Sequence, residues 1–359
     1  MNIPEGILKN DEKAIFRLRS LYRSRGYEPY RMSKFEEYDL YVRNKSFLVS
    51  DNIITFTDTD GKLMALKPDV TLSIVKNTKD GESRKLYYNE NVYRVSEGSH
   101  SYKEIMQTGL ECIGNIDTYA LSEVLSLALG SLGEISEDFV LDVAHLGITS
   151  TLISLLGIEG EGKKRLLSCI GEKNVHSAEA VCREFGVDEF NTERIKRLIK
   201  CYGAPDRVIS ELHEFLTEKE FKEDIDTLEA VVSLIDSDKV RIDFSVVMDT
   251  TYYNGIVFKG YIRTIPSAVL SGGQYDSLMR RLSRSSGAVG FAVYLDVLEG
   301  LSTLDEYDVD TLVLYSDKTR LSKINETVKK ELSRSQRVRT EKKIPEKLKY
   351  KTLVDITED

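Results

Sequence analysis

Residues 247–258 read VMDTTYYNGIVF and contain two adjacent tyrosines, Tyr252 and Tyr253. A tyrosine ring packs against apolar groups while its hydroxyl forms a hydrogen bond, so such a pair can line a small-molecule pocket. Phosphate or acyl chemistry would also require a cationic side chain, and Met248 stands nearby instead. Taken alone, two adjacent tyrosines are more often the buried and exposed sides of one strand.

A second group of polar residues lies in the segment MQTGLECIG at 106–114. If this segment is a strand, then Gln107, Gly109 and Glu111 share one face, and Gly109 leaves room between the two polar side chains. Carboxylates and hydroxyls are suitable acceptors for an ammonium or an imidazole group. Glu111 alone would more often be a solvated strand residue.

Other candidate groups are weaker. Asp142 and His145 are close enough in sequence to suggest a proton relay, but an ordinary strand end is the simpler interpretation. Gly272-Gly273 is as typical of a turn as of a phosphate loop. No cysteine or histidine pair has metal-ligand spacing, so we expect no metal site and no cofactor. The four cysteines are scattered and are typical of reduced, buried thiols, at Cys112, Cys169, Cys182 and Cys201.

The bulk composition is that of a globular protein, with 359 residues, 41% hydrophobic and 30% charged. A net charge of −9 argues against a general nucleic-acid binder. No apolar run reaches the roughly 20 residues that span a bilayer, and the first residues do not form a secretory signal. We therefore expect a cytoplasmic protein with no membrane association.

These candidate residues must be positioned by a mixture of strands and helices. Helical periodicity covers 11–26, where Gly26 suits a C-terminal cap, and a helix is predicted to start near Asp69. Asp60-Gly61 favours a hairpin between strands within 46–66. Further predicted elements are two antiparallel strands at 85–95 and 106–114 with a polar loop between them, a helix at 117–130 and a strand at 138–147.

The pattern changes after this point. Strand patterns are missing from about 148 to 236, which predicts a helical insertion, and strands resume at 241–248, 251–262 and 268–273. Residues 287–302 begin as a strand or turn and continue as an apolar helix. The fold class is α+β, an antiparallel sheet flanked by helices. We predict a core at 1–302 and a truncated α/β segment at 303–359, joined by a linker near 302–308.

Four motifs occur in a fixed order and together resemble the catalytic core of histidyl-tRNA synthetase, a class II aminoacyl-tRNA synthetase. They span about residues 1–300. GYEPYRMSKFEEYDLY (26–41) looks like motif 1, and LKPDVT (66–71) resembles the amino-acid loop R-P-E/D-x-T. VYRVSEGSHSYKEIMQTGLECIG (92–114) is similar to motif 2. The last element joins TTYYNGIVFKGY (250–261) to SGGQYDSLMRRL and GAVGFAVYLDVL (271–298), which resemble the histidine signature and motif 3.

The departures from that family concern chemistry. The family carries an arginine four residues before the tyrosine pair, where this chain has Met248. Its motif 3 ends G-F-A-x-G-L-E-R-L, whereas this chain has GFAVYLDVL, with Asp296 and Val297 in place of the glutamate and the ATP-binding arginine. The motif 2 loop has lost its arginines, and residues 303–359 are all that stands where the family has its anticodon-binding domain.

The resemblance implies a histidine site without catalytic residues. Asp69, Thr71 and Gln107 would take the α-amino group. Glu111 and Tyr253 would take the imidazole nitrogens, with Tyr252 packed beside them. Arg94, on the facing strand, is the remaining candidate for the carboxylate.

The pattern of losses resembles the regulatory-subunit family of ATP phosphoribosyltransferase, a non-catalytic paralogue of the synthetase. The resemblance implies an activator of the short-form catalytic subunit of that glycosyltransferase, in the first step of histidine biosynthesis. It also implies an allosteric sensor of histidine and a homodimer within a hetero-oligomer.

Two alternatives stay open. The chain could be a divergent histidyl-tRNA synthetase or an amino-acid-activating paralogue, although Met248 and Val297 argue against that activity. It could instead bind tRNA through the Lys- and Arg-rich C-terminal segment around KKIPEKLKYK. A solvated charged face is the simpler interpretation of that segment, so we do not expect tRNA to be a partner.

Overall fold

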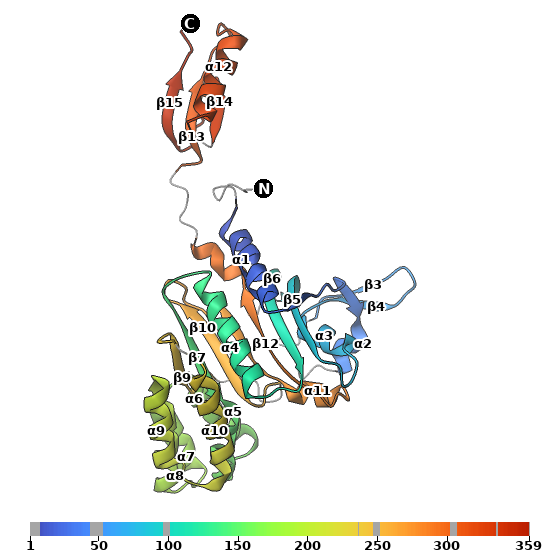
Figure 1. Ribbon diagram of the computed structural model, residues 1–359, viewed down its shortest axis with the longest axis vertical. Coiled ribbons are helices and arrows are strands. Elements are labelled where there is room, and N and C mark those ends of the chain that lie inside the picture. The colour runs from blue at the N-terminus through green and yellow to red at the C-terminus, as the bar shows by residue number, and fades with distance from the viewer. Residues whose placement is uncertain are drawn as a thin grey trace. The chain divides into compact units, whose positions relative to one another are not determined.

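The sheet that carries the candidate residues is built from strands far apart in the sequence (Figure 1). The structure is a computed structural model that describes residues 8–43, 53–95, 101–235, 237–246, 252–301, 307–334 and 337–358. In the described chain this sheet has nine strands. Their spatial order is β1 (Glu28–Pro29), β5 (Arg84–Val95), β6 (Tyr102–Gly114), β12 (Gly287–Tyr294), β11 (Leu270–Gln274), β10 (Ile256–Ile262), β7 (Phe139–His145), β9 (Val240–Asp243) and β8 (Tyr202–Gly203).

The pairings in this sheet are antiparallel except for β1 with β5 and β7 with β9. The predicted α+β class with a mainly antiparallel sheet is confirmed. Strand β6 begins at Tyr102 and pairs with β5 as far as Val95, so the predicted loop at 96–104 was too long. The predicted strand at 46–50 lies outside the described residues, as does most of the predicted linker at 302–308.

One face of the large sheet is apolar and is covered by helices α1 (Asn10–Ser24) and α4 (Thr118–Gly133), as Figure 1 shows. The buried ring of Tyr22 in α1 lies 6.1 Å from the ring of Tyr87 and 6.0 Å from that of Phe291. Its hydroxyl lies 3.0 Å from Ser131 Oγ in α4. Because side chains alternate along a strand, Gln107 and Glu111 of β6 lie on the opposite face.

A smaller three-stranded sheet includes one strand, β2 (Phe35–Glu37), from the segment that resembles motif 1. It has the order β2, β4 (Leu63–Leu66), β3 (Thr55–Thr57), and it is followed by the short helix α3 (Thr71–Asn77). Asp58 accepts hydrogen bonds from the backbone of Asp60 and Lys62, which confirms the predicted hairpin. Helix α2 (Tyr38–Arg43) packs on the same sheet.

The segment after β7 is helical apart from the two-residue strand β8. Its helices are α5 (Leu146–Leu155), α6 (Gly160–Gly171), α7 (Val175–Glu184), α8 (Glu189–Lys200), α9 (Pro205–Phe215) and α10 (Lys219–Ser233). Helix α11 (Asp276–Arg281) follows β11, and a 3₁₀ helix, η2 (Asp296–Leu301), follows β12 where an apolar helix was predicted. No helix in the described residues is long and apolar enough to cross a membrane.

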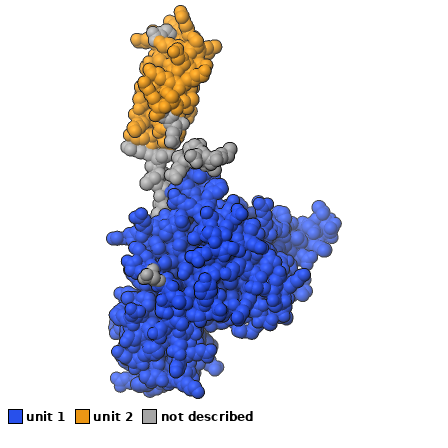
Figure 2. All heavy atoms as spheres, in the orientation of Figure 1, with its two compact units in different colours: residues 1–300 blue, residues 301–359 orange. Residues whose placement is uncertain are grey.

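The chain divides into two compact units, residues 1–300 and 301–359 (Figure 2). The second unit is a three-stranded parallel sheet with one helix, ordered β14 (Val338–Glu341), β13 (Val309–Leu314), β15 (Tyr350–Asp355), with α12 at Leu321–Leu332. Residues 301–359 hold 13 Lys and Arg against 12 Asp and Glu, so their charge is nearly balanced. Ion pairs join Arg337 to Asp310 and Lys342 to Asp317.

Candidate functional site

Strand β6 forms the base of the candidate site on the polar face of the sheet. Gln107, Gly109 and Glu111 lie at alternate positions of β6, as predicted, and face the same way. The neighbouring strand β12 places Gly290 opposite Glu111. A Cβ atom on Gly290 would lie 1.8 Å from Glu111 Oε2, so the buried carboxyl group fits only because this residue is glycine.

The Glu111 carboxyl group is held by two hydroxyl donors. Thr71 Oγ1 donates to Oε1 over 2.6 Å, and the Tyr275 hydroxyl donates to Oε2 over 2.5 Å. Burial raises the pKa of Glu111 to about 8; both hydrogen bonds lower the pKa and the charge of Asp69 raises it further. The carboxyl group is therefore largely protonated at neutral pH until a donor or a cation stabilises its charge.

Asp69 and Arg94 lie at the other side of the site. Asp69 Oδ1 accepts the backbone N–H of Leu72 at 2.8 Å, at the start of α3, where a capping carboxylate was predicted. Burial raises the pKa of Asp69, opposed by that hydrogen bond and by the charge of Arg94. Arg94 Nε donates to the carbonyl of Pro68 at 3.1 Å, so the guanidinium is tied to the loop that carries Asp69.

Gln107 carries an unsatisfied donor. Its side chain is 4% exposed, and its Nε2 has no hydrogen-bond partner among the described residues. A buried amide donor without a partner costs about 1–3 kcal/mol. An acceptor group on a ligand would remove that cost, so Gln107 marks where a ligand oxygen or nitrogen is needed.

The tyrosine pair lies in a turn before β10 and not within a strand, which corrects the predicted strand at 251–262. The rings of Tyr252 and Tyr253 are 4.5 Å apart, and Tyr252 lies 5.8 Å from the ring of Tyr275. Tyr253 packs over β11, where a Cβ atom on Gly273 would lie 2.8 Å from its ring. Both tyrosines face the site.

The same turn is fixed by hydrogen bonds to the start of α11. The backbone N–H of Asn254 donates to the carbonyl of Gln274 at 3.1 Å, and Gln274 Nε2 donates to Asp276 Oδ2 at 2.7 Å. Asp276 Oδ1 accepts the backbone N–H of Ala288 at 2.9 Å, which ties this network to β12. These hydrogen bonds therefore fix the position of the turn relative to β12 and to its neighbour β6.

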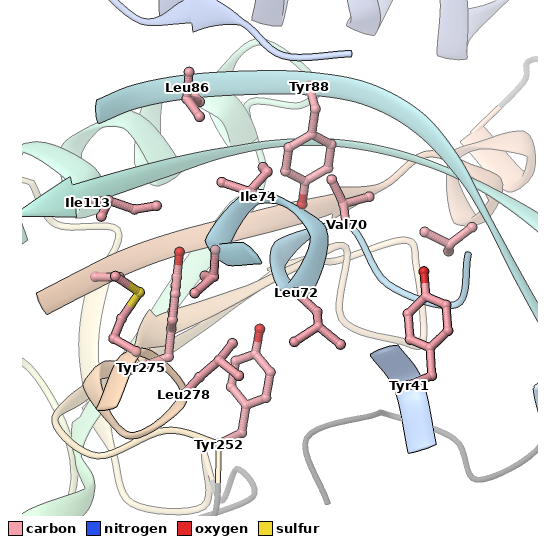
Figure 3. Packing of buried hydrophobic residues seen from close by; sticks show 14 of the residues in the cluster. Tyr41, Val70, Leu72, Ile74, Leu86, Tyr88, Ile113, Tyr252, Tyr275 and Leu278 are labelled. Atoms are coloured by element: carbon pink, nitrogen blue, oxygen red, sulfur yellow. The ribbon is translucent and has the colours of Figure 1, made fainter. Parts of the chain in front are cut away.

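Two further tyrosines belong to the site and were missed from the sequence. Figure 3 shows Tyr88, Tyr252 and Tyr275 gathered around α3, in a cluster with Val70, Leu72 and Ile74. The Tyr88 hydroxyl fills the space above Gly109, where an added Cβ would lie 2.5 Å from it. Gly109 thus makes room for Tyr88 and does not leave the open space that was expected. Tyr275 lies inside the segment that resembles motif 3, which was the available signal.

The structure brings six of the seven predicted site residues together, directly or through neighbours: Asp69, Thr71, Arg94, Glu111, Tyr252 and Tyr253. The seventh, Gln107, shares the face of Glu111 on β6. Met248 lies outside the described residues. Val297 lies in η2, just beyond the end of β12, and is partly buried. Asp142 and His145 are three residues apart on β7 and point to opposite faces of the sheet, so they do not form a relay.

The polar site on an antiparallel sheet, framed by motifs in this order, defines a class II synthetase-like core. The family model of histidyl-tRNA synthetase matches residues 6–298, and the chain belongs to that family. The curated proteins to which it is similar include several with the name ATP phosphoribosyltransferase regulatory subunit. The Oceanobacillus iheyensis protein is 26% identical over 311 residues, covering 84% of this chain and 76% of that protein. The Clostridium kluyveri protein is 28% identical over 319 residues, covering 83% and 81%.

Solved structures show the same fold. A protein from Bacillus halodurans, described as an ATP phosphoribosyltransferase regulatory subunit/histidyl-tRNA synthetase, superposes with a TM-score of 0.72 at 22% identity, covering 100% of this chain and 97% of that one. A chain of the ATP phosphoribosyl transferase (HisG:HisZ) complex from Thermotoga maritima gives a TM-score of 0.62 at 21% identity, covering 79% and 97%.

Proposed function

We propose that this chain is a non-catalytic regulatory subunit of ATP phosphoribosyltransferase that binds histidine in the cytoplasm. The observation that carries the proposal is the contrast within one site. The amino-acid side is assembled around the buried Glu111, whereas the aliphatic Val297 stands where the synthetase has its ATP-binding arginine. The names of the curated relatives support the same assignment.

Histidine would fit the site through its three polar groups. Its imidazole would lie between Glu111 and Tyr253, with the ring of Tyr252 beside it, and would supply the donor that a buried carboxylate needs. Its ammonium group would lie near Asp69 and Thr71. The resemblance implies that Gln107 takes the ammonium group, but its unpaired Nε2 is a donor and suits an acceptor. We therefore place the ligand carboxylate at Gln107 Nε2, with Arg94 as the nearby cation.

Amino-acid activation is disfavoured by the same residues. The carboxylate would have to attack the α-phosphate of ATP, and preorganised donors must stabilise the negative charge that accumulates. One such donor is worth roughly 100–1000-fold in rate. Met248 and Val297 offer neither charge nor a hydrogen-bond donor.

Regulation would then follow from linkage. Histidine that binds one state of the hetero-oligomer more tightly shifts the population toward that state, by a coupling free energy of typically about 1–3 kcal/mol. The partner is the short-form catalytic subunit, and the chain would act as a homodimer within the complex. The balanced charge of residues 301–359 supports a solvated face there and gives no reason to add tRNA as a partner.

Reconstitution with a short-form catalytic subunit tests the proposal. We expect the two chains to co-purify, and product formation from ATP and phosphoribosyl pyrophosphate to require both. Failure to associate would contradict the proposal. Histidine-dependent exchange between ATP and pyrophosphate by this chain alone would establish the synthetase-like alternative in its place.

A further inference from the structure

The side chains that β12 presents to the site change abruptly in size along the strand. Gly290, Ala292 and Tyr294 occupy alternate positions and share the face of Glu111. The first two are small and leave the sheet surface open. Tyr294 is the large residue of the three, and in the motif 3 pattern quoted above its position is a glycine.

Tyr294 has a defined place on the sheet. It pairs across the strands with Gln107, and its hydroxyl lies 2.5 Å from Ser271 Oγ on β11. Ser271 pairs with Ala292, so it is the diagonal neighbour of Tyr294 on the same face. The phenol ring therefore crosses the surface between β12 and β11 beside Gln107.

The neighbouring strand surfaces are covered as well. The Tyr88 hydroxyl lies over Gly109 on β6, and the ring of Tyr253 lies over Gly273 on β11. Burial is the main cause that raises the pKa of Tyr88 and of Tyr253, and the nearby Tyr294 adds to both shifts, which places the three phenols close to one another. The three phenols therefore cover parts of β6, β11 and β12 on the face that carries Gln107.

The direction of a bound amino acid makes this closure selective. Glu111 and Gln107 are four strand residues apart, roughly 13 Å at about 3.3 Å per residue. With its imidazole at Glu111, histidine extends its carboxylate toward Gln107, where Tyr294 begins. Resting on the proposed function, we infer that Tyr294 is a specificity-determining residue that admits free histidine and rejects ligands enlarged at the carboxylate, such as bulky amides, esters or acyl-linked nucleotides.

Titration calorimetry with three ligands tests this inference. Histidinamide removes the carboxylate charge without adding bulk, and histidine benzylamide adds bulk to that same amide. In the wild-type chain we expect benzylamide to bind at least tenfold more weakly than histidinamide. Tyr294→Ala should reduce that ratio at least fivefold while leaving the ratio of histidine to histidinamide unchanged, because only space is altered.

Two variants control for the shape of the ring and for its anchoring. Tyr294→Phe keeps the ring but also loses the hydroxyl contact with Ser271, so it should retain most of the wild-type ratio and behave like Ser271→Ala. Ser271→Ala releases the hydroxyl contact, so it should lower the ratio by a smaller factor, and it provides the test if Tyr294→Ala does not unfold cooperatively. The inference is overturned if the ratio of histidinamide to benzylamide affinity stays at the wild-type value in both Tyr294→Ala and Ser271→Ala. It is also overturned if that preference disappears completely in Tyr294→Phe. A wild-type chain that binds neither histidine nor histidinamide overturns the proposed function as well, which distinguishes the two failures.

Discussion

At the scale of single residues, the site depends on a carboxyl group that the fold keeps out of water. Glu111 is 2% exposed, and in the part of the chain that the structure describes it accepts hydrogen bonds from two hydroxyl groups and from no cation. Such a group is stable when protonated or when a ligand supplies a charged or strongly polar donor. This arrangement suits reversible recognition, because the carboxylate is fully stabilised only when the ligand arrives.

The titration of Glu111 predicts how stability depends on pH. The unfolded chain releases this proton near its ordinary pKa of 4.5, whereas the folded protein holds it up to about pH 8. Ionisation between these values favours the unfolded state, so the free energy of unfolding falls as pH rises through this window, by about 2–5 kcal/mol. The side chain in Glu111→Gln does not titrate. The melting temperature of this variant, relative to that of the wild-type protein, should therefore rise from pH 5 to pH 8. A constant difference between the two proteins would contradict the assigned pKa.

The glycine opposite Glu111 gives a second prediction. Gly290→Ala would place a methyl group 1.8 Å from Glu111 Oε2 and 2.5 Å from the carbonyl of Leu110. Overpacking of this kind costs about 1–3 kcal/mol, and displacement of the carboxyl group should weaken histidine binding at least tenfold.

Gly133→Ala is the matched control for that change. An added Cβ there would meet its nearest neighbour, Phe139, at an ordinary 3.7 Å. Thermal unfolding and calorimetry should show little change in this variant. Equal effects of the two substitutions would mean that the contact with Glu111 is unimportant.

At the scale of elements, local sequence pattern predicted the strands better than it predicted where they end and which turns connect them. The hairpin β5–β6 and the shared face of Gln107 and Glu111 follow from alternation in the sequence. The extension of β6 back to Tyr102 does not follow from alternation, because the polar residues at the start of β6 become ordered by pairing with β5. Tyr252 and Tyr253 looked like strand residues, but the hydrogen bonds of Asn254 to the chain near α11 hold them in a turn.

The residues missed by sequence reasoning are those with no local signature. Tyr275 reaches Glu111 across 164 residues of sequence, and no local periodicity predicts that contact, although Tyr275 lies within the segment that resembles motif 3. From the sequence, Tyr88 is indistinguishable from other aromatic strand residues. Only the register of β5 and β6 shows that its hydroxyl lies over Gly109. The seven residues that were predicted came from a family resemblance in motif order, which encodes long-range contacts that periodicity does not.

The network at the start of α11 carries a prediction at this scale. Asp276→Ala would remove acceptors for Gln274 Nε2 and for the backbone of Ala288. The turn that bears Tyr252 and Tyr253 should then lose its fixed position, and calorimetry should show histidine bound roughly tenfold more weakly, the loss expected for about 1.4 kcal/mol. Unchanged affinity would show that the turn is held by its aromatic packing alone.

At the scale of the whole molecule, every predicted site residue lies in the unit formed by residues 1–300. We therefore propose that this unit is the ligand-binding domain and that residues 301–359 are dispensable for recognition. A chain that ends at residue 300 should unfold cooperatively and bind histidine within about twofold of the full chain, an effect well below 1 kcal/mol. Loss of folding or of binding would contradict the predicted domain organisation.

The most direct test of the regulatory site is histidine inhibition of the reconstituted complex with the short-form catalytic subunit. With the wild-type chain, product formation should fall as histidine is added. Glu111→Ala should support the same uninhibited activity but require at least tenfold more histidine for half inhibition, since hydrogen bonds to charged groups are worth about 1.5–3 kcal/mol. Glu137→Ala, at an exposed position before β7, serves as the control and should match wild type. Equal histidine sensitivity of the wild-type and Glu111→Ala complexes would contradict the account.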